Sequence, residues 1–186
     1  SVQIAFVVML LVQLIASTTT QPAEPAGSLI DAASVTTAVE SIRVEDLKRH
    51  VGTLASDALQ GREAGTTSGH AASAYLIQEL RKQRATPAAA DGQFVQEFDG
   101  TMRNVLSCVK GRDPRLADEA IIVCAHYDHV GFGTPRNSRG PVGYIHNGAD
   151  DNASGTAALL EVIEAMQLAQ NIGSLRRRSR CRKSNS

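Results

Sequence analysis

Residues 120–131 read AIIVCAHYDHVG, a run of β-branched and other apolar residues that leads into a His-x-Asp triplet. A short continuous apolar run of this kind predicts a strand that is covered on both faces of a sheet. His126 and Asp128 stand just past the end of that strand, where ligands gather in α/β sheets. Cys124, inside the run, is predicted to be a small core residue.

The neighbouring segments alternate between helical and strand patterns. The predicted helices begin at residue 44 and cover about 69–84 and 153–170, and the other predicted strands cover 94–98 and 103–110. Strands that alternate with helices predict an α/β fold, in which helices pack on both faces of a sheet. We assign this domain to residues 28–170.

The beginning of the chain has a different composition. Residues 4–16, IAFVVMLLVQLIA, are almost wholly apolar and are too short to span a bilayer comfortably. They predict an export signal that is cleaved near Ala16, so residues 1–27 are assigned to the signal and a flexible leader. The alternative is an uncleaved segment that tethers the chain to a membrane.

Charge is unevenly distributed along the chain. Residues 171–186 carry six basic residues and no acidic one, and the remainder carries 13 basic against 19 acidic residues. The remainder, residues 1–170, therefore has a net charge of about −6, which excludes a nucleic-acid-binding function because such a protein needs a basic face. The tail is either a disordered basic extension or, as we favour, the product of a reading frame that fails near residue 171.

A second motif, HNGADDNASG, covers residues 146–155. Gly148 permits a tight turn, and Asn152 or Ser154 can cap the helix that follows. A carboxylate can bridge two metal ions roughly 3.5–4 Å apart, and a zinc-bound imidazole usually donates its other N–H to a carboxylate. Taken alone, this motif fits a polar turn and helix N-cap as well as it fits a metal site.

Together, AHYDHVG at 125–131 and NGADDNASG at 147–155 resemble the dinuclear-zinc aminopeptidase family that also contains glutamate carboxypeptidase-type enzymes. LASDALQGREAGT at 54–66 and RNVLSCVKG at 103–111 extend the resemblance to exported bacterial members, over about 44–170. The resemblance implies a three-layer, aminopeptidase/phosphorylase-hydrolase-like α/β fold, of which this chain would hold the N-terminal half.

The resemblance also implies roles for four residues. His126 would ligate one zinc ion and Asp150 would bridge two. Asp128 would be the acid behind the His126 imidazole, and Asp151 would support the bridging position or the turn.

Other polar residues near the motifs do not match the family's ligand positions. His129 and His146 are expected to face solvent or the substrate pocket, and Glu161 and Glu164 are expected to form a solvated helix edge. The family's general-base Glu and its remaining Glu, Asp and His ligands would follow further along the chain, so no catalytic residue is assigned within these 186 residues.

The implied function is an exported zinc aminopeptidase, periplasmic or extracellular, that cleaves N-terminal residues from peptides through a water activated by two zinc ions. Peptides are its expected partners, with no nucleic acid and no stable membrane partner. One ligand and one bridge are too few to hold two zinc ions tightly, so we expect the chain as written to be inactive. The alternatives are a non-catalytic peptidase-like binding module and a single-zinc transferase similar to glutaminyl cyclases.

Overall fold

A computed structural model describes residues 5–10 and 32–183 of the chain. The strands are β1 (Ala5–Leu10), β2 (Thr86–Pro87), β3 (Val95–Phe98), β4 (Met102–Val109) and β5 (Ile121–His126). The helices are α1 (Ala32–Glu40), α2 (Val44–Leu54), α3 (Thr67–Lys82) and α4 (Ser154–Lys183), and short helical turns lie at η1 (Asp57–Leu59), η2 (Pro114–Leu116) and η3 (Ala149–Ala153). The predicted helices and strands are thus present, and each begins within a few residues of its predicted start.

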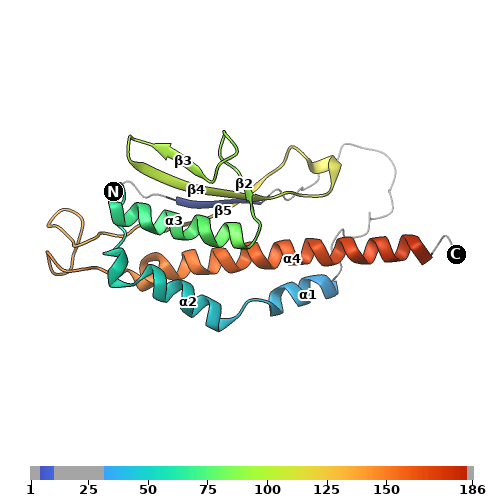
Figure 1. Ribbon diagram of the computed structural model, residues 1–186, viewed down its shortest axis with the longest axis horizontal. Helices are drawn as coiled ribbons and strands as arrows, with labels where there is room; N and C mark the ends of the chain where they lie inside the picture. The colour runs from blue at the N-terminus through green and yellow to red at the C-terminus, as the bar shows by residue number, and fades with distance from the viewer. Residues whose placement is uncertain (1–4, 11–31, 184–186) are drawn as a thin grey trace, which may run out of the picture.

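The strands form one mixed sheet in the order β2-β4-β1-β5, with β3 also paired to β4 (Figure 1). Strand β1 runs parallel to β4 and antiparallel to β5, so the C-terminal end of β4 lies beside the beginning of β5. The combination of helices with this sheet confirms the α/β class.

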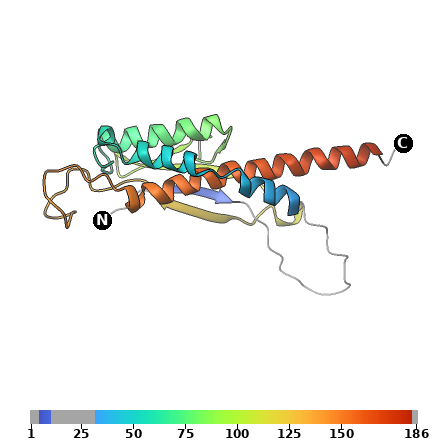
Figure 2. The same cartoon turned by 90° about the horizontal axis from the view of Figure 1, so that it is seen from below.

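The helices lie on one side of this sheet, as Figures 1 and 2 show from two directions. A second helical layer on the other face, as in the expected three-layer fold, is not confirmed within the described residues. The predicted burial of β5 on both faces is wrong, because Ile122 is 64% exposed and Cys124 is also exposed. Strand β5 ends the sheet, so its outer edge and face lack the neighbours that would cover an internal strand.

Both ends of the chain differ from the expected pattern. Residues 5–10, part of the predicted export signal, form strand β1 between β4 and β5, whereas most of the remaining signal and leader lies outside the described residues. Helix α4 does not end near residue 170 but continues to Lys183 and projects beyond the sheet (Figure 2). Arg and Lys favour helices, which explains why a basic tail without apolar periodicity can extend α4.

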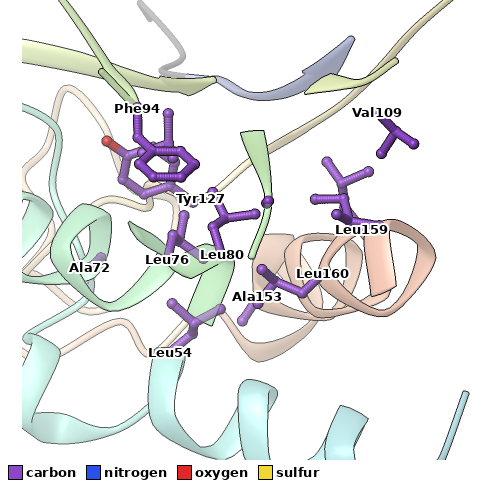
Figure 3. Close-up of a cluster of buried hydrophobic side chains, with 13 residues drawn as sticks. Leu54, Ala72, Leu76, Leu80, Phe94, Val109, Tyr127, Ala153, Leu159 and Leu160 are labelled. Atoms are coloured by element: carbon purple, nitrogen blue, oxygen red, sulfur yellow. The ribbon is translucent and has the colours of Figure 1, made fainter. Parts of the chain in front are cut away.

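The hydrophobic core lies between the sheet and helices α2, α3 and α4 (Figure 3). Its fully buried members include Leu54 of α2, Leu76 and Leu80 of α3, and Leu160 and Ile163 of α4. The apolar stripes predicted for these three helices therefore face one another and the sheet. Within the described residues, no helix has the length and apolar character needed to cross a membrane.

A buried polar cluster joins the same three helices. His50 of α2 lies with Nδ1 2.7 Å from the Tyr75 hydroxyl of α3 and with Nε2 3.5 Å from Glu161 Oε1 of α4. Glu161 is only 3% exposed, so its predicted place on a solvated edge is wrong, whereas Glu164 is exposed as expected. Burial raises the pKa of the Glu161 carboxyl and lowers the pKa of His50, because each charged form loses its hydration.

Replacing Glu161 with Gln should therefore stabilise the fold at high pH. The carboxyl has a higher pKa in the folded than in the unfolded chain, so the wild-type fold loses stability as pH rises above about 4.5. We expect E161Q to gain on the order of 1 kcal/mol at pH 8 and to lose this advantage towards pH 4. Urea unfolding at several pH values measures the difference. The exposed Glu164→Gln is the control, and E161Q less stable than wild type at pH 8 would contradict the prediction.

Candidate functional site

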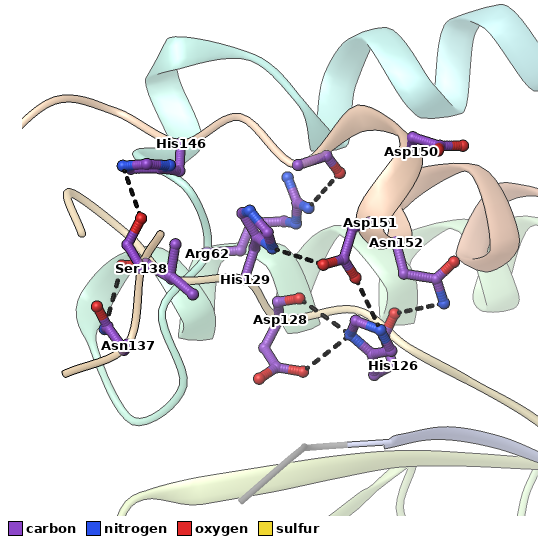
Figure 4. A network of polar contacts seen from close by, with 12 residues as sticks. Arg62, His126, Asp128, His129, Asn137, Ser138, His146, Asp150, Asp151 and Asn152 are labelled. Atoms are coloured by element: carbon purple, nitrogen blue, oxygen red, sulfur yellow. Dashed lines mark hydrogen bonds and ion pairs between the residues drawn. The ribbon is translucent and has the colours of Figure 1, made fainter. Parts of the chain in front are cut away.

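The two sequence motifs meet at the end of β5 (Figure 4). The backbone carbonyl of His126 accepts hydrogen bonds from Asn152 Nδ2 at 3.2 Å and from Thr156 Oγ1 at 3.0 Å. The segment that opens α4 is thereby fixed to the last residue of β5. The predicted convergence of the two motifs is present in the structure.

Tyr127 sets the direction of its two polar neighbours. Its ring is buried in the core, and its hydroxyl donates to the Arg103 carbonyl at 2.6 Å. Successive side chains of an extended segment point to opposite sides, so a buried Tyr127 turns His126 and Asp128 away from the core. The apolar strand and the aromatic residue inside the His-x-Asp triplet together aim these two side chains at the site.

Both ring nitrogens of His126 face an acidic residue. Nδ1 lies 3.2 Å from the backbone carbonyl of Asp128 and 3.5 Å from its Oδ1, and Nε2 lies 3.1 Å from Asp151 Oδ1. Asp128 thus lies beside Nδ1, whereas Asp151 lies beside Nε2 of the same ring. With a proton on Nδ1, Nε2 is free to bind a cation that also contacts Asp151; without a cation, an Nε2–H donates to Asp151 Oδ1.

Of the two adjacent acids, it is Asp151 that meets His126. Its Oδ2 lies 3.6 Å from His129 Nδ1, so the two oxygens of one carboxylate face two imidazoles. The Asp150 side chain points away from these rings (Figure 4), although Asp150 was the expected bridging acid. Asp151 and Asn152 have non-helical backbone angles inside η3, and this kink turns Asp151 towards β5.

His129 lies in the site beside Asp151 and not at the solvent, which was one of its two expected places. Its side chain is largely buried, and its ring packs directly against the backbone of Gly148. Burial lowers the pKa of His129, against the opposing influence of the nearby Asp151 carboxylate. The second expected solvent residue, His146, instead closes the 130–147 loop, with Nε2 2.8 Å from the Pro141 carbonyl.

Arg62 is the residue that inspection of the sequence missed. It is fully buried, and its guanidinium donates to the carbonyls of Tyr127 at 2.8 Å, Asn147 at 2.6 Å and Gly148 at 2.9 Å, and to that of Leu54. One side chain therefore ties together the end of α2 and both motif loops. An arginine directly after a glycine in the loop segment LQGREAGT was the signal available in the sequence.

The surroundings of Arg62 are tightly packed and electrostatically balanced. A side chain at Gly61 would place its Cβ 2.6 Å from the carbonyls of both Gly131 and His146, so glycine is required beside Arg62. Burial lowers the pKa of the guanidinium, whereas the negative charges of Asp128 and Asp151 raise it. The two acids that flank His126 thus also offset the buried positive charge.

Part of this arrangement fits a zinc ion. Two ligand atoms on one tetrahedral zinc lie roughly 3.3 Å apart, given bonds of about 2.0 Å. His126 Nε2 and Asp151 Oδ1, at 3.1 Å, therefore match one edge of such a coordination sphere. In the part of the chain that the structure describes, no three His, Cys, Asp or Glu side chains come together as a complete metal site.

Comparison with known proteins identifies a family and its named relatives. Residues 104–177 match peptidase family M28. The chain is 24% identical over 141 residues to "Leucine aminopeptidase 1" of Leptosphaeria maculans, across 75% of this chain and 33% of that protein. It is 28% identical over 142 residues to "Probable leucine aminopeptidase" of Trichophyton verrucosum, across 75% of this chain and 34% of that protein. The chain spans about a third of the length of these relatives, and no solved structure matches it.

Replacing Arg62 with Met should unfold the site and weaken the whole fold. Methionine fills much of the space but leaves four carbonyls without their donor, and unsatisfied buried groups cost about 1–3 kcal/mol each before relaxation. We expect R62M to lose at least about 3 kcal/mol in urea unfolding. Arg81→Met, on the exposed last turn of α3, should change stability by less than about 0.5 kcal/mol. Equal midpoints for wild type and R62M would show that Arg62 does not hold the loops.

Proposed function

Because the chain belongs to peptidase family M28, we propose that it supplies part of the zinc centre of an aminopeptidase. The observation that carries the proposal is the 3.1 Å contact between His126 Nε2 and Asp151 Oδ1, with Asp128 behind the imidazole. The names of the two relatives support peptides as substrates and cleavage at the N-terminal residue.

In this proposal His126 is a zinc ligand through Nε2, and Asp128 orients it. A carboxylate or carbonyl behind a ligating imidazole holds the proton on the other nitrogen and fixes the ring. The contacts of His126 Nδ1 with the carbonyl and carboxylate of Asp128 support this role. Bound zinc would lower the pKa of a water molecule and polarise the scissile carbonyl.

The bridging role goes to Asp151 instead of Asp150. A bridging carboxylate presents one oxygen to each metal ion, and Asp151 turns Oδ1 towards His126 and Oδ2 towards His129. Asp150 would then shape the turn, where its backbone carbonyl accepts a hydrogen bond from the Ser154 hydroxyl at 3.1 Å.

The proposal extends to the complete fold and to export. A second helical layer over the face that exposes Ile122 and Cys124 would complete the three-layer fold, and the 64% exposure of Ile122 supports a covering layer. Export to the periplasm or the cell exterior is supported by the apolar residues 4–16 and the polar segment after them.

Metal binding by single variants tests which acid is the ligand. We expect the 186-residue chain to bind Zn²⁺ weakly, and His126→Asn and Asp151→Asn each to lower its affinity at least about tenfold. Asp150→Asn makes the same chemical change one residue away and should leave the affinity within about twofold. Competition with a chromogenic zinc chelator measures all four proteins. A larger loss in D150N than in D151N would return the bridging role to Asp150.

The isolated chain should lack peptidase activity even when zinc is added. Each catalytic zinc needs about three protein ligands, and His126 with a shared Asp151 supplies fewer. We expect no release of p-nitroaniline from L-leucine p-nitroanilide above a blank that contains zinc and buffer. Turnover by the purified chain that disappears in Asp151→Asn would contradict this prediction.

A further inference from the structure

A polar cavity lies at the opposite end of the sheet from His126. It encloses about 410 Å³ between the end of α3, the end of β4 and the middle of α4, elements that lie side by side in Figure 1. Strands β4 and β5 lie on either side of β1 and run in opposite directions. The end of β4 and the start of β5 are therefore at the same end of the sheet, and His126 is at the other end. The cavity is lined mainly by Gln83, Arg84, Lys110, Gln167, Cys108 and Val109.

Two enclosed side-chain atoms of this lining make no hydrogen bond within the described residues. They are Gln83 Oε1, an acceptor, and Gln167 Nε2, a donor. The other end of the Gln83 amide is fixed, because its Nε2 donates to the Leu160 carbonyl at 3.2 Å. Both atoms are almost fully covered, so each amide must turn towards the cavity to meet a ligand. Buried polar atoms nearly always have a partner, so the cavity suits a molecule that offers both a donor and an acceptor.

The cavity is also positively charged. Arg84 and Lys110 belong to its lining, and no acidic residue does. A small anion would therefore be attracted to it, and a carboxylate would match the fork of an arginine. Cys108 and Val109, both buried, add an apolar wall.

Arg84 occupies a backbone position that normally favours glycine. Its φ is +58°, and the bonds from Arg84 N to the Arg81 carbonyl and from Ala85 N to the Leu80 carbonyl form a Schellman motif at the end of α3. Glycine is the usual residue at this left-handed position because it carries no Cβ. An arginine at this position therefore has a backbone cost that a glycine would not have.

We propose that this cavity binds a small carboxylate that also carries a hydrogen-bond donor, of which a free α-amino acid is the simplest example. The carboxylate contacts Arg84, Lys110 and Gln167 Nε2, and the ammonium group donates to Gln83 Oε1. The Cys108 and Val109 wall contacts the ligand's side chain. The proposal is independent of the zinc centre, since it uses no residue of the two motifs.

The test is calorimetric titration of the purified chain with L-leucine, in EDTA so that no metal site contributes. L-leucinamide, which lacks the carboxylate, is the matched probe. We expect L-leucine to bind with a Kd below about 10 mM and leucinamide at least about tenfold more weakly. Binding of both probes with equal affinity, or no binding of L-leucine, would overturn the proposal.

Two variants separate binding from folding. Arg84→Gly relieves the left-handed backbone, so its melting temperature should equal or exceed that of wild type while L-leucine affinity falls at least about tenfold. Gln167→Leu, which removes the enclosed donor, should weaken binding to a similar extent, and Arg81→Ala on the preceding turn should not. Wild-type affinity in both R84G and Q167L would refute the assignment.

Discussion

The buried guanidinium of Arg62 is the interaction on which the site depends. Its donors satisfy carbonyls at the end of α2, after β5 and before α4, so three segments far apart in the sequence share one side chain. Loop carbonyls buried without such a donor would lose their hydration without compensation. The close approach that this clamp requires is possible only because Gly61 has no side chain. Arg62 is thus as important to the geometry of the site as the residues that would contact metal or substrate.

The hydrogen bonds of Arg62 explain how loops without regular secondary structure hold the side chains of the site in fixed positions. Arg62 and the buried Tyr127 fix the backbone directly after His126, and Asn152 fixes the opening of α4 to the His126 carbonyl. The backbone therefore places the side chains of His126 and Asp151 next to each other, and this placement does not depend on the exposed contact between them. That contact is expected to contribute little to stability, because Asp151 is 70% exposed and surface ion pairs are weak. The arrangement of these two side chains suits the binding of a third group, such as a metal ion, better than it suits stabilisation of the fold.

The two ends of the sheet carry different chemical groups. At the end of β5, acidic and imidazole groups converge beside the positive charge of Arg62. At the end of β4, amide and cationic groups of α3, β4 and α4 enclose a cavity. Between them the apolar residues of the three helices pack into one core, which keeps both ends in place. The uncovered face of β5 is the part of the sheet whose apolar surface still lacks a partner among the described residues.

The sequence by itself determined helices α2 and α3, the start of α4, and strands β3, β4 and β5, because apolar periodicity and the strand before His126 are local properties of the chain. The resemblance of the two motifs to a peptidase family also predicted that they share a site, with Asp128 behind His126. Only the tertiary structure decided which of two adjacent, chemically identical acids meets the imidazole, because a backbone kink at Asp151 sets that direction. The same holds for buried Arg62, buried Glu161 and exposed Cys124. Burial depends on which elements pack against a residue, and the pattern of its neighbours in sequence does not specify that.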